Sequence, residues 1–223
     1  MATNIKYCIW DVGKTIYPYT LVPLDKWAAA HTVCPEDYTK GRNIFTYDYN
    51  PYMRGEISFQ QVCSEICRQY NIPFTTSTPQ EINKALHQGV GKAYPETLET
   101  MRLLQQKGIS NGILSNALPI LNNTAPIDGL VEPQHIFTSY ELKLLKPDIR
   151  IYQAVRQKLG CRFEEMMFID DKPANVNAAC SLGIKGIVCR HEALKTSVLS
   201  VLHADIKNSK LFPVNKNKRD ASL

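Results

Sequence analysis

Short apolar runs alternate with amphipathic stretches along most of the chain. Five runs have the length and composition of strands buried on both faces of a sheet: 5–10, 109–114, 135–137, 166–169 and 184–189. Apolar residues recur at helical spacing in the stretches between and after them: 95–107, 118–123, 148–159, 173–182 and 191–202. Gly108 and Gly160 follow two of these stretches, a position where glycine commonly ends a helix. This alternation predicts an α/β fold, with a Rossmann-like doubly wound parallel sheet as its core.

One connection is far too long for a simple crossover between two strands. Residues 17–92 separate the first strand from the first core helix, and they contain helical patterns of their own at 24–31, 37–44, 58–70 and 80–88. Ser58 is placed to cap one of these helices, and Pro79 fits the first turn of another. We therefore expect three parts: a core domain of residues 1–16 and 93–205, an inserted α-helical cap domain of residues 17–92, and a basic C-terminal tail of residues 206–223.

The composition is that of a soluble globular protein. Hydrophobic residues make up 44% of the 223 positions and charged residues 21%. No stretch approaches the ~20 apolar residues of a membrane span, and the first residues lack the apolar core of a secretory signal. We expect a cytoplasmic monomer or homodimer that does not contact a membrane.

The seven cysteines are odd in number and irregularly spaced, which favours free thiols in a reducing compartment over a disulfide framework. Cys63 and Cys67 share one face of a predicted helix. A zinc site would need two more ligands at matching spacing, and the sequence offers no such set. We therefore expect these two thiols to lie in the hydrophobic core.

The net charge of +5 is concentrated at the C-terminus. The chain has 26 basic and 21 acidic residues, and five of the bases lie between Lys207 and Arg219. Residues 1–206 carry 21 bases and 20 acids, so the body of the protein is almost neutral. The basic stretch is typical of a solvated terminus, and no interleaving of aromatic and basic residues accompanies it. We expect no nucleic-acid partner.

Polar groups with complementary chemistry stand at the ends of the predicted strands. Asp11 follows the first strand, Ser115 follows the second, and Asp170 and Asp171 follow the fourth. Lys146 precedes a helix that begins with proline. Such sheets bind ligands at the carboxyl ends of their strands, so we expect these groups to converge. Together they offer a nucleophile, a hydroxyl, a cation and an acidic pair suited to Mg²⁺ beside a phosphoryl group.

Each of these features also has an ordinary structural explanation. A Ser-Asn pair after a strand is common turn chemistry, and a Lys-Pro-Asp sequence often marks the start of a helix. An Asp pair can cap the helix that follows it. For each feature alone, the structural explanation is stronger than a functional one. For all the features together a functional site is the stronger explanation, because the groups lie at strand ends in this order.

This order resembles that of the haloacid dehalogenase (HAD) superfamily of aspartyl-phosphate phosphatases. The resemblance covers residues 5–16 and about 93–205, and residues 17–92 occupy the position of the helical cap of subfamily I. The sequence DDKPANV at 170–176 resembles the double-Asp subgroup, which includes N-terminal domains of epoxide hydrolases and small sugar-phosphate phosphatases. Each motif is weak by itself, but four in the right order with the cap in the right gap are specific.

The resemblance implies a role for each motif residue in phosphoryl transfer. Asp11 would be the nucleophile that forms an aspartyl-phosphate. Ser115, Asn116 and Thr15 would contact the phosphate, and Thr15 would also orient the turn that carries the nucleophile. Lys146 would hold both Asp11 and the phosphate, and its charge would offset theirs.

The resemblance also implies a Mg²⁺ cofactor. Its ligands would be the carboxylates of Asp11 and Asp171 and the carbonyl oxygen of Gly13, whereas Asp170 and Asn175 would support the metal without binding it. The implied activity is hydrolysis of a small phosphorylated metabolite such as a sugar phosphate.

The first motif departs from the usual Asp-x-Asp-Gly-Thr of this superfamily. Here the sequence of residues 11–15 is DVGKT, so Gly13 replaces the second Asp and Lys14 replaces the glycine. The missing carboxyl normally acts as general acid and base, a contribution of ~10²–10⁴-fold. Three outcomes follow: a substrate whose leaving group needs little protonation, a proton supplied by Lys14 or by the cap, or a site that has lost catalysis. Lys14 could equally weaken metal binding or be an exposed turn residue.

Other functions compete with a phosphatase. A 2-haloacid dehalogenase would use Asp11 without a metal, but paired carboxylates without a cation would repel one another and the substrate. The altered first motif also suits a binding or regulatory protein that turns nothing over. Six of the eleven tyrosines lie in the first half of the predicted cap, and one or two of them could face the substrate together with Arg54. The six are Tyr17, Tyr19, Tyr38, Tyr47, Tyr49 and Tyr52.

Overall fold

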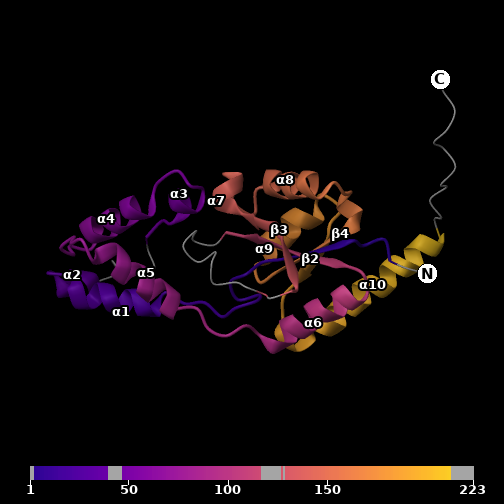
Figure 1. Cartoon of the computed structure of the whole chain (residues 1–223), viewed down its shortest axis with the longest axis horizontal. Coiled ribbons are helices and arrows are strands. Elements are labelled where there is room, and N and C mark those ends of the chain that lie inside the picture. Colours follow the sequence, from indigo (N-terminus) through magenta and orange to yellow (C-terminus); the bar gives the residue numbers. More distant parts are fainter. Residues whose placement is uncertain (1–2, 40–46, 117–126, 128, 212–223) are drawn as a thin grey trace, which may run out of the picture.

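A five-stranded parallel sheet forms the core of the protein (Figure 1). The structure is a computed structural model that describes residues 3–39, 47–116, 127 and 129–211. The strands are β1 (Tyr7–Trp10), β2 (Ser110–Ser115), β3 (Val131–Thr138), β4 (Met166–Asp170) and β5 (Lys185–Val188). Their order across the sheet is β3-β2-β1-β4-β5, and every pairing is parallel. The predicted α/β fold with a doubly wound sheet is therefore confirmed.

Helices cover both faces of this sheet. Helices α6 (Pro95–Gln106) and α10 (Leu194–Leu211) pack on one face, and α8 (Ile149–Leu159) and α9 (Pro173–Cys180) pack on the other. Strand β1 shows why both layers are needed, since its successive side chains point to opposite faces. Cys8 and Trp10 belong to the hydrophobic cluster under α6 and α10, whereas Ile9 belongs to the cluster under α8 and α9.

The segment between β1 and α6 forms a separate group of helices (Figure 1). These are α1 (Val22–His31), α2 (Pro35–Thr39), α3 (Asn50–Met53), α4 (Phe59–Gln69) and α5 (Thr78–Gln88). They have a hydrophobic cluster of their own, whose buried members all lie between Leu24 and Leu86. Cys63 and Cys67 are free thiols buried in this cluster, as expected for core residues.

Local signals in the sequence fix several helix ends. The side chain of Ser58 accepts a hydrogen bond from the backbone N–H of Gln61, and the Gln61 side chain accepts one from the N–H of Ser58. This reciprocal capping starts α4. The Asp148 side chain accepts a hydrogen bond from the Arg150 N–H and so caps α8, and Gly160 ends α8 in the left-handed conformation.

The structure differs from the predicted elements in a few places. Two short helices escaped prediction, α3 and α7 (Ser139–Leu142), because a single turn has too little periodicity to detect. Helix α10 continues to Leu211, past the predicted end at 202 and across the predicted start of the tail. The predicted helix 118–123 and the later part of 37–44 lie outside the described residues. No helix in the described ranges is long and apolar enough to cross a membrane.

Candidate active site

The predicted site residues come together at the carboxyl end of the sheet. Strand β1 lies between β2 and β4, so Asp11, Ser115 and Asp170, which stand at or just after their carboxyl ends, lie side by side. The backbone N–H of Asp11 donates a 2.8 Å hydrogen bond to the carbonyl of Ile169, which continues the β1–β4 ladder as far as the carboxylate. The strand order therefore determines which carboxylates face each other.

Lys146 is the electrostatic centre of this arrangement. Its ammonium lies 2.6 Å from Asp11 Oδ1 and 2.8 Å from Asp170 Oδ2, and it donates to the carbonyl oxygen of Leu114 at 2.7 Å. Its side chain is only 1% exposed. Each of the three ammonium protons thus has a buried acceptor, and the lysine holds the two carboxylates beside each other.

The Asp170 carboxylate is fully engaged by the protein. Its Oδ2 also accepts a hydrogen bond from the amide of Asn175 at 2.9 Å, and its Oδ1 accepts one from the backbone N–H of Lys172 at 2.8 Å. The Tyr152 hydroxyl in turn donates to the carbonyl of Asn175 at 2.8 Å. Asp170 and Asn175 are therefore placed to fix Lys146, in keeping with a supporting role behind the site.

Asn116 joins the end of β2 to the loop that carries Lys146. Its side-chain oxygen accepts a hydrogen bond from the Lys146 backbone N–H at 3.0 Å, and its amide donates to the Lys146 carbonyl at 2.9 Å. Because both ends of the amide are engaged, Asn116 positions the lysine loop, while its predicted contact with phosphate stays a prediction.

The turn after β1 is held by its own backbone. The carbonyl of Val12 accepts hydrogen bonds from the N–H groups of Ile16 and Tyr17, at 2.9 and 3.0 Å. Thr15 is fully buried beneath the turn, and its carbonyl accepts a hydrogen bond from the Thr97 hydroxyl at 2.8 Å. This burial favours the predicted orienting role of Thr15 over direct contact with phosphate.

Gly13 is not required by packing. A Cβ atom at this position would meet no other atom within 4 Å. Nor does Gly13 appear among the described residues with a positive φ angle. The backbone and its surroundings at this position therefore leave space for a Cβ atom, so neither close packing nor backbone conformation requires glycine here.

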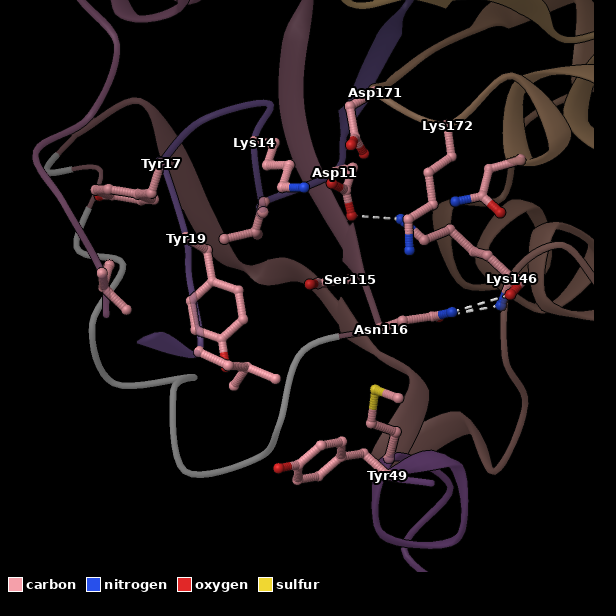
Figure 2. A pocket seen from close by; sticks show the side chains of 16 residues that line it. Asp11, Lys14, Tyr17, Tyr19, Tyr49, Ser115, Asn116, Lys146, Asp171 and Lys172 are labelled. Atoms are coloured by element: carbon pink, nitrogen blue, oxygen red, sulfur yellow. Dashed lines mark hydrogen bonds and ion pairs between the residues drawn. The ribbon is translucent and has the colours of Figure 1, made fainter. Parts of the chain in front are cut away.

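Lys14 adopts a left-handed backbone conformation, with a φ of 61°. Its exposed side chain lines the cavity, and its amine points toward Asp11 in Figure 2. Its charge acts on the neighbouring carboxylates, since it is one of the cations that lower the pKa of Asp171. Lys14 is thus an exposed turn residue, as one interpretation of the sequence expected, while its predicted roles in donating a proton or weakening metal binding stay predictions.

Two carboxyl groups of the acidic cluster, those of Asp11 and Asp171, have a raised pKa. Burial raises the pKa of Asp11 from its ordinary value of 3.8 to about 6, although the Lys146 ammonium opposes this and the Asp170 carboxylate adds to it. Burial and Asp170 also raise the pKa of Asp171. The carboxylate oxygens of Asp11, Asp170 and Asp171 lie within 4.8 Å of one another, so a cation between them would relieve this repulsion.

A cavity of about 320 Å³ opens from these groups toward the helices of residues 17–92 (Figure 2). Most of the predicted site residues line it: Asp11, Gly13, Ser115, Asn116, Lys146, Asp171 and Asn175. Six further lining residues come from the segment 17–92: Tyr17, Tyr19, Leu21, Tyr49, Met53 and Val90. Arg54 is not among the lining residues, and its guanidinium pairs with Glu56 instead. The tyrosine cluster was the only sequence signal for this wall, and it did not distinguish lining tyrosines from core ones.

Comparison with known proteins identifies the family. The family model of haloacid dehalogenase-like hydrolases matches residues 5–183. The chain belongs to the haloacid dehalogenase-like hydrolases. The match includes every strand-end residue described above and the segment between β1 and α6, in agreement with the resemblance seen in the sequence.

Three curated relatives illustrate the range of proteins that this chain resembles. It is 28% identical to acyl-CoA dehydrogenase family member 10 of Mus musculus over 93% of its own length, but it spans only 20% of that protein. It is 24% identical to a sesquiterpene phosphatase of Aspergillus oryzae, over 84% of this chain and 91% of the relative. It is 28% identical to (S)-2-haloacid dehalogenase 1 of a Pseudomonas species, over 43% of each chain.

Solved structures share the HAD fold. A HAD family enzyme from Bacteroides thetaiotaomicron, crystallised with magnesium and inorganic phosphate, superposes with a TM-score of 0.65. The two chains are 21% identical, and the match covers 84% of this chain and 95% of the other. At this level of identity the comparison establishes a common fold.

Proposed function

We propose that this HAD hydrolase is a Mg²⁺-dependent phosphatase that acts on a small organic phosphate, with Asp11 as its nucleophile. The observation that carries the proposal is the hydrogen bond from Lys146 to only one oxygen of Asp11, at the bottom of a cavity that also exposes Asp171 and Ser115. The second oxygen of Asp11 is the one available to attack. The relative from Aspergillus oryzae that is a phosphatase supports the same activity.

The donor set fits a hard divalent cation. Both oxygens of Asp170 already accept hydrogen bonds from Lys146, Asn175 and Lys172. That leaves Asp11, Asp171 and the carbonyl of Gly13 as oxygen ligands, and Mg²⁺ commonly binds through few protein oxygens together with water and phosphate. A bound Mg²⁺ would neutralise charge on the phosphoryl oxygens, as it does in other phosphoryl transfers.

Two steps follow from the geometry of the chain. In the first, a carboxylate oxygen of Asp11 attacks phosphorus, the bond from phosphorus to the ester oxygen breaks, and an aspartyl-phosphate forms while the alcohol leaves and takes up a proton. In the second, water attacks phosphorus and releases phosphate and the Asp11 carboxylate. Lys146 and the Ser115 hydroxyl stabilise the negative phosphoryl oxygens in both steps. Because position 13 carries no carboxyl, alcohols that leave readily as anions are favoured.

A 2-haloacid dehalogenase is the second candidate, and a relative with that activity supports it. The three neighbouring carboxylates argue against it, because without a metal ion a carboxylate substrate would add a fourth negative charge to three that the Lys146 ammonium offsets only in part.

The decisive experiment measures hydrolysis of p-nitrophenyl phosphate, with and without Mg²⁺, for the wild type and two variants. Asp11→Asn should abolish turnover, and so should EDTA. Asp148→Asn is the matched control, since it makes the same chemical change outside the cavity and asparagine caps helices as well as aspartate does. Phosphate release by Asp11→Asn would overturn the proposal, as would metal-independent chloride release from 2-chloropropionate by the wild type.

A further inference from the structure

Two buried phenol hydroxyls stand at the end of the cavity opposite the carboxylates. The hydroxyl oxygens of Tyr19 and Tyr49 are shielded from solvent, and neither has a hydrogen-bond partner among the described residues. Both side chains line the cavity (Figure 2). Buried polar atoms in folded proteins normally have a partner. Two hydroxyls without a hydrogen-bond partner belong to side chains on the wall of the same cavity. This indicates that a bound ligand supplies the partner.

The positions of both rings are fixed before a ligand arrives. Tyr19 pairs with Val90 in an antiparallel bridge, and the neighbouring Thr20 N–H donates to the carbonyl of Gly89 at 3.0 Å. The two connections between the sheet and residues 17–92 therefore form a small ladder that holds Tyr19. The ring of Tyr49 packs edge-on against that of Tyr47, with 4.7 Å between their centroids.

The wall that surrounds these hydroxyls is apolar. Besides the tyrosines, residues 17–92 contribute Leu21, Met53 and Val90 to the lining, and within the described chain none of their lining residues carries a charge. Within the described chain, all charged lining residues come from the core side, on the loops that follow β1, α7 and β4. The cavity thus has one charged end for a phosphate and one apolar end with two isolated hydroxyls. Its volume is at the small end of the range for ligand sites.

We infer that Tyr19 and Tyr49 select the alcohol part of the substrate, which is a compact and mainly apolar group carrying one hydrogen-bonding oxygen at the end remote from the phosphate. The inference rests on the proposed phosphatase function and adds the substrate class to it. Burial raises the pKa of both phenols, so both keep their protons at neutral pH and can donate to that oxygen. A polyol phosphate would instead bury several hydroxyls against a wall where, among the described residues, the only polar side-chain groups are tyrosine hydroxyls.

The test compares three primary alkyl phosphates with similar leaving groups. They are 2-phenylethyl phosphate, 2-(4-hydroxyphenyl)ethyl phosphate, which adds the remote oxygen, and glucitol 6-phosphate, which is a polyol. For the wild type with Mg²⁺, we expect kcat/KM to be about tenfold higher for the hydroxylated ring than for the plain ring. The polyol should be the poorest of the three.

Phenylalanine variants assign the selectivity to the two tyrosines. Tyr19→Phe and Tyr49→Phe should each lower the advantage of the hydroxylated ring over the plain ring, and the double variant should abolish it. Tyr47→Phe is the matched control, because the Tyr47 hydroxyl donates to Glu65 at 2.6 Å and lies outside the lining. Its preference among the three phosphates should equal that of the wild type.

Calorimetric binding of the same phosphates to the Asp11→Asn variant separates this inference from the proposed function. If the wild type hydrolyses no phosphate, the proposed function fails, and the order of the three dissociation constants still decides the inference. Tightest binding of the hydroxylated ring, lost in the Phe variants, supports the inference. Tighter binding or faster hydrolysis of glucitol 6-phosphate would overturn it, and so would a preference that survives in the double Phe variant.

Discussion

The ammonium of Lys146 is the only cation in direct contact with the two most buried carboxylates of the site, within the described chain. Its side chain is 1% exposed, and those of Asp11 and Asp170 are 11% and 0% exposed. In Lys146→Met the methionine retains most of the volume of the lysine side chain, so little of the effect should come from a cavity. Removing one partner of a buried ion pair costs about 3–5 kcal/mol, and we expect a loss of unfolding free energy in this range at pH 8.

The dependence on pH distinguishes this explanation from a general loss of packing. The pKa of Asp11 is raised to about 6 even with the lysine present, and loss of the ammonium removes a cause that lowers it. A carboxyl group whose pKa is raised in the folded state contributes most to folding stability at pH values below its unfolded pKa, which is near 3.8. This contribution is lost as the pH rises through the folded pKa. The deficit of Lys146→Met should therefore be small at pH 5 and full at pH 8.

The assay is urea unfolding in EDTA at both pH values, followed by tryptophan fluorescence, since Trp10 is buried in the sheet beside the site. The double variant Lys146→Met/Asp170→Asn should recover part of the lost stability, because it removes one of the two uncompensated carboxylates. A loss below about 1 kcal/mol at pH 8 would refute the reasoning, and so would an equal loss at both pH values.

Three further predictions address catalysis, the contact between cap and core, and acid stability. Gly13→Asp should fold normally, and it should raise kcat at least tenfold for alkyl phosphates but little for p-nitrophenyl phosphate, because only the alkyl alcohols need a proton to leave. Equal gains on both substrates would contradict the idea that position 13 lacks a general acid. In Gly55→Ala the new Cβ would meet the Lys143 ammonium, which donates to the Gly55 carbonyl, and would lie 2.9 Å from the Tyr140 ring, so it would disturb the contact between residues 17–92 and the core. KM should therefore rise more than in Gly108→Ala, a control that also has a positive φ but open space around the new Cβ. Lys6 lowers the pKa of Glu165, so Glu165→Gln should be less stable than wild type at pH 7 in thermal melts, and the difference should close below pH 4.5.

Local sequence was sufficient to predict the sheet strands and most helices. Buried parallel strands are continuous apolar runs, and side chains such as Ser58 and Asp148 act on the backbone beside them, so these elements carry their own signals. The lengths of β3 and α10 were underestimated, because partly exposed residues at their ends break the apolar pattern. Pairing of strands is a property of the whole chain, yet the rule that ligands bind at strand ends still brought Asp11, Ser115 and Asp170 into one hypothesis.

What the sequence by itself determined is the set of chemical groups and their order along the chain. Only the tertiary structure decided where each group lies and what it contacts. It engaged Asp170 and Asn116 in holding Lys146, buried Thr15 beneath the turn, and left Asp171 facing the cavity. It also separated the three tyrosines that line the cavity from the other three of the six. The sequence could not do this, because a tyrosine that lines a cavity and one that fills a core have the same spacing and differ only in what packs against them.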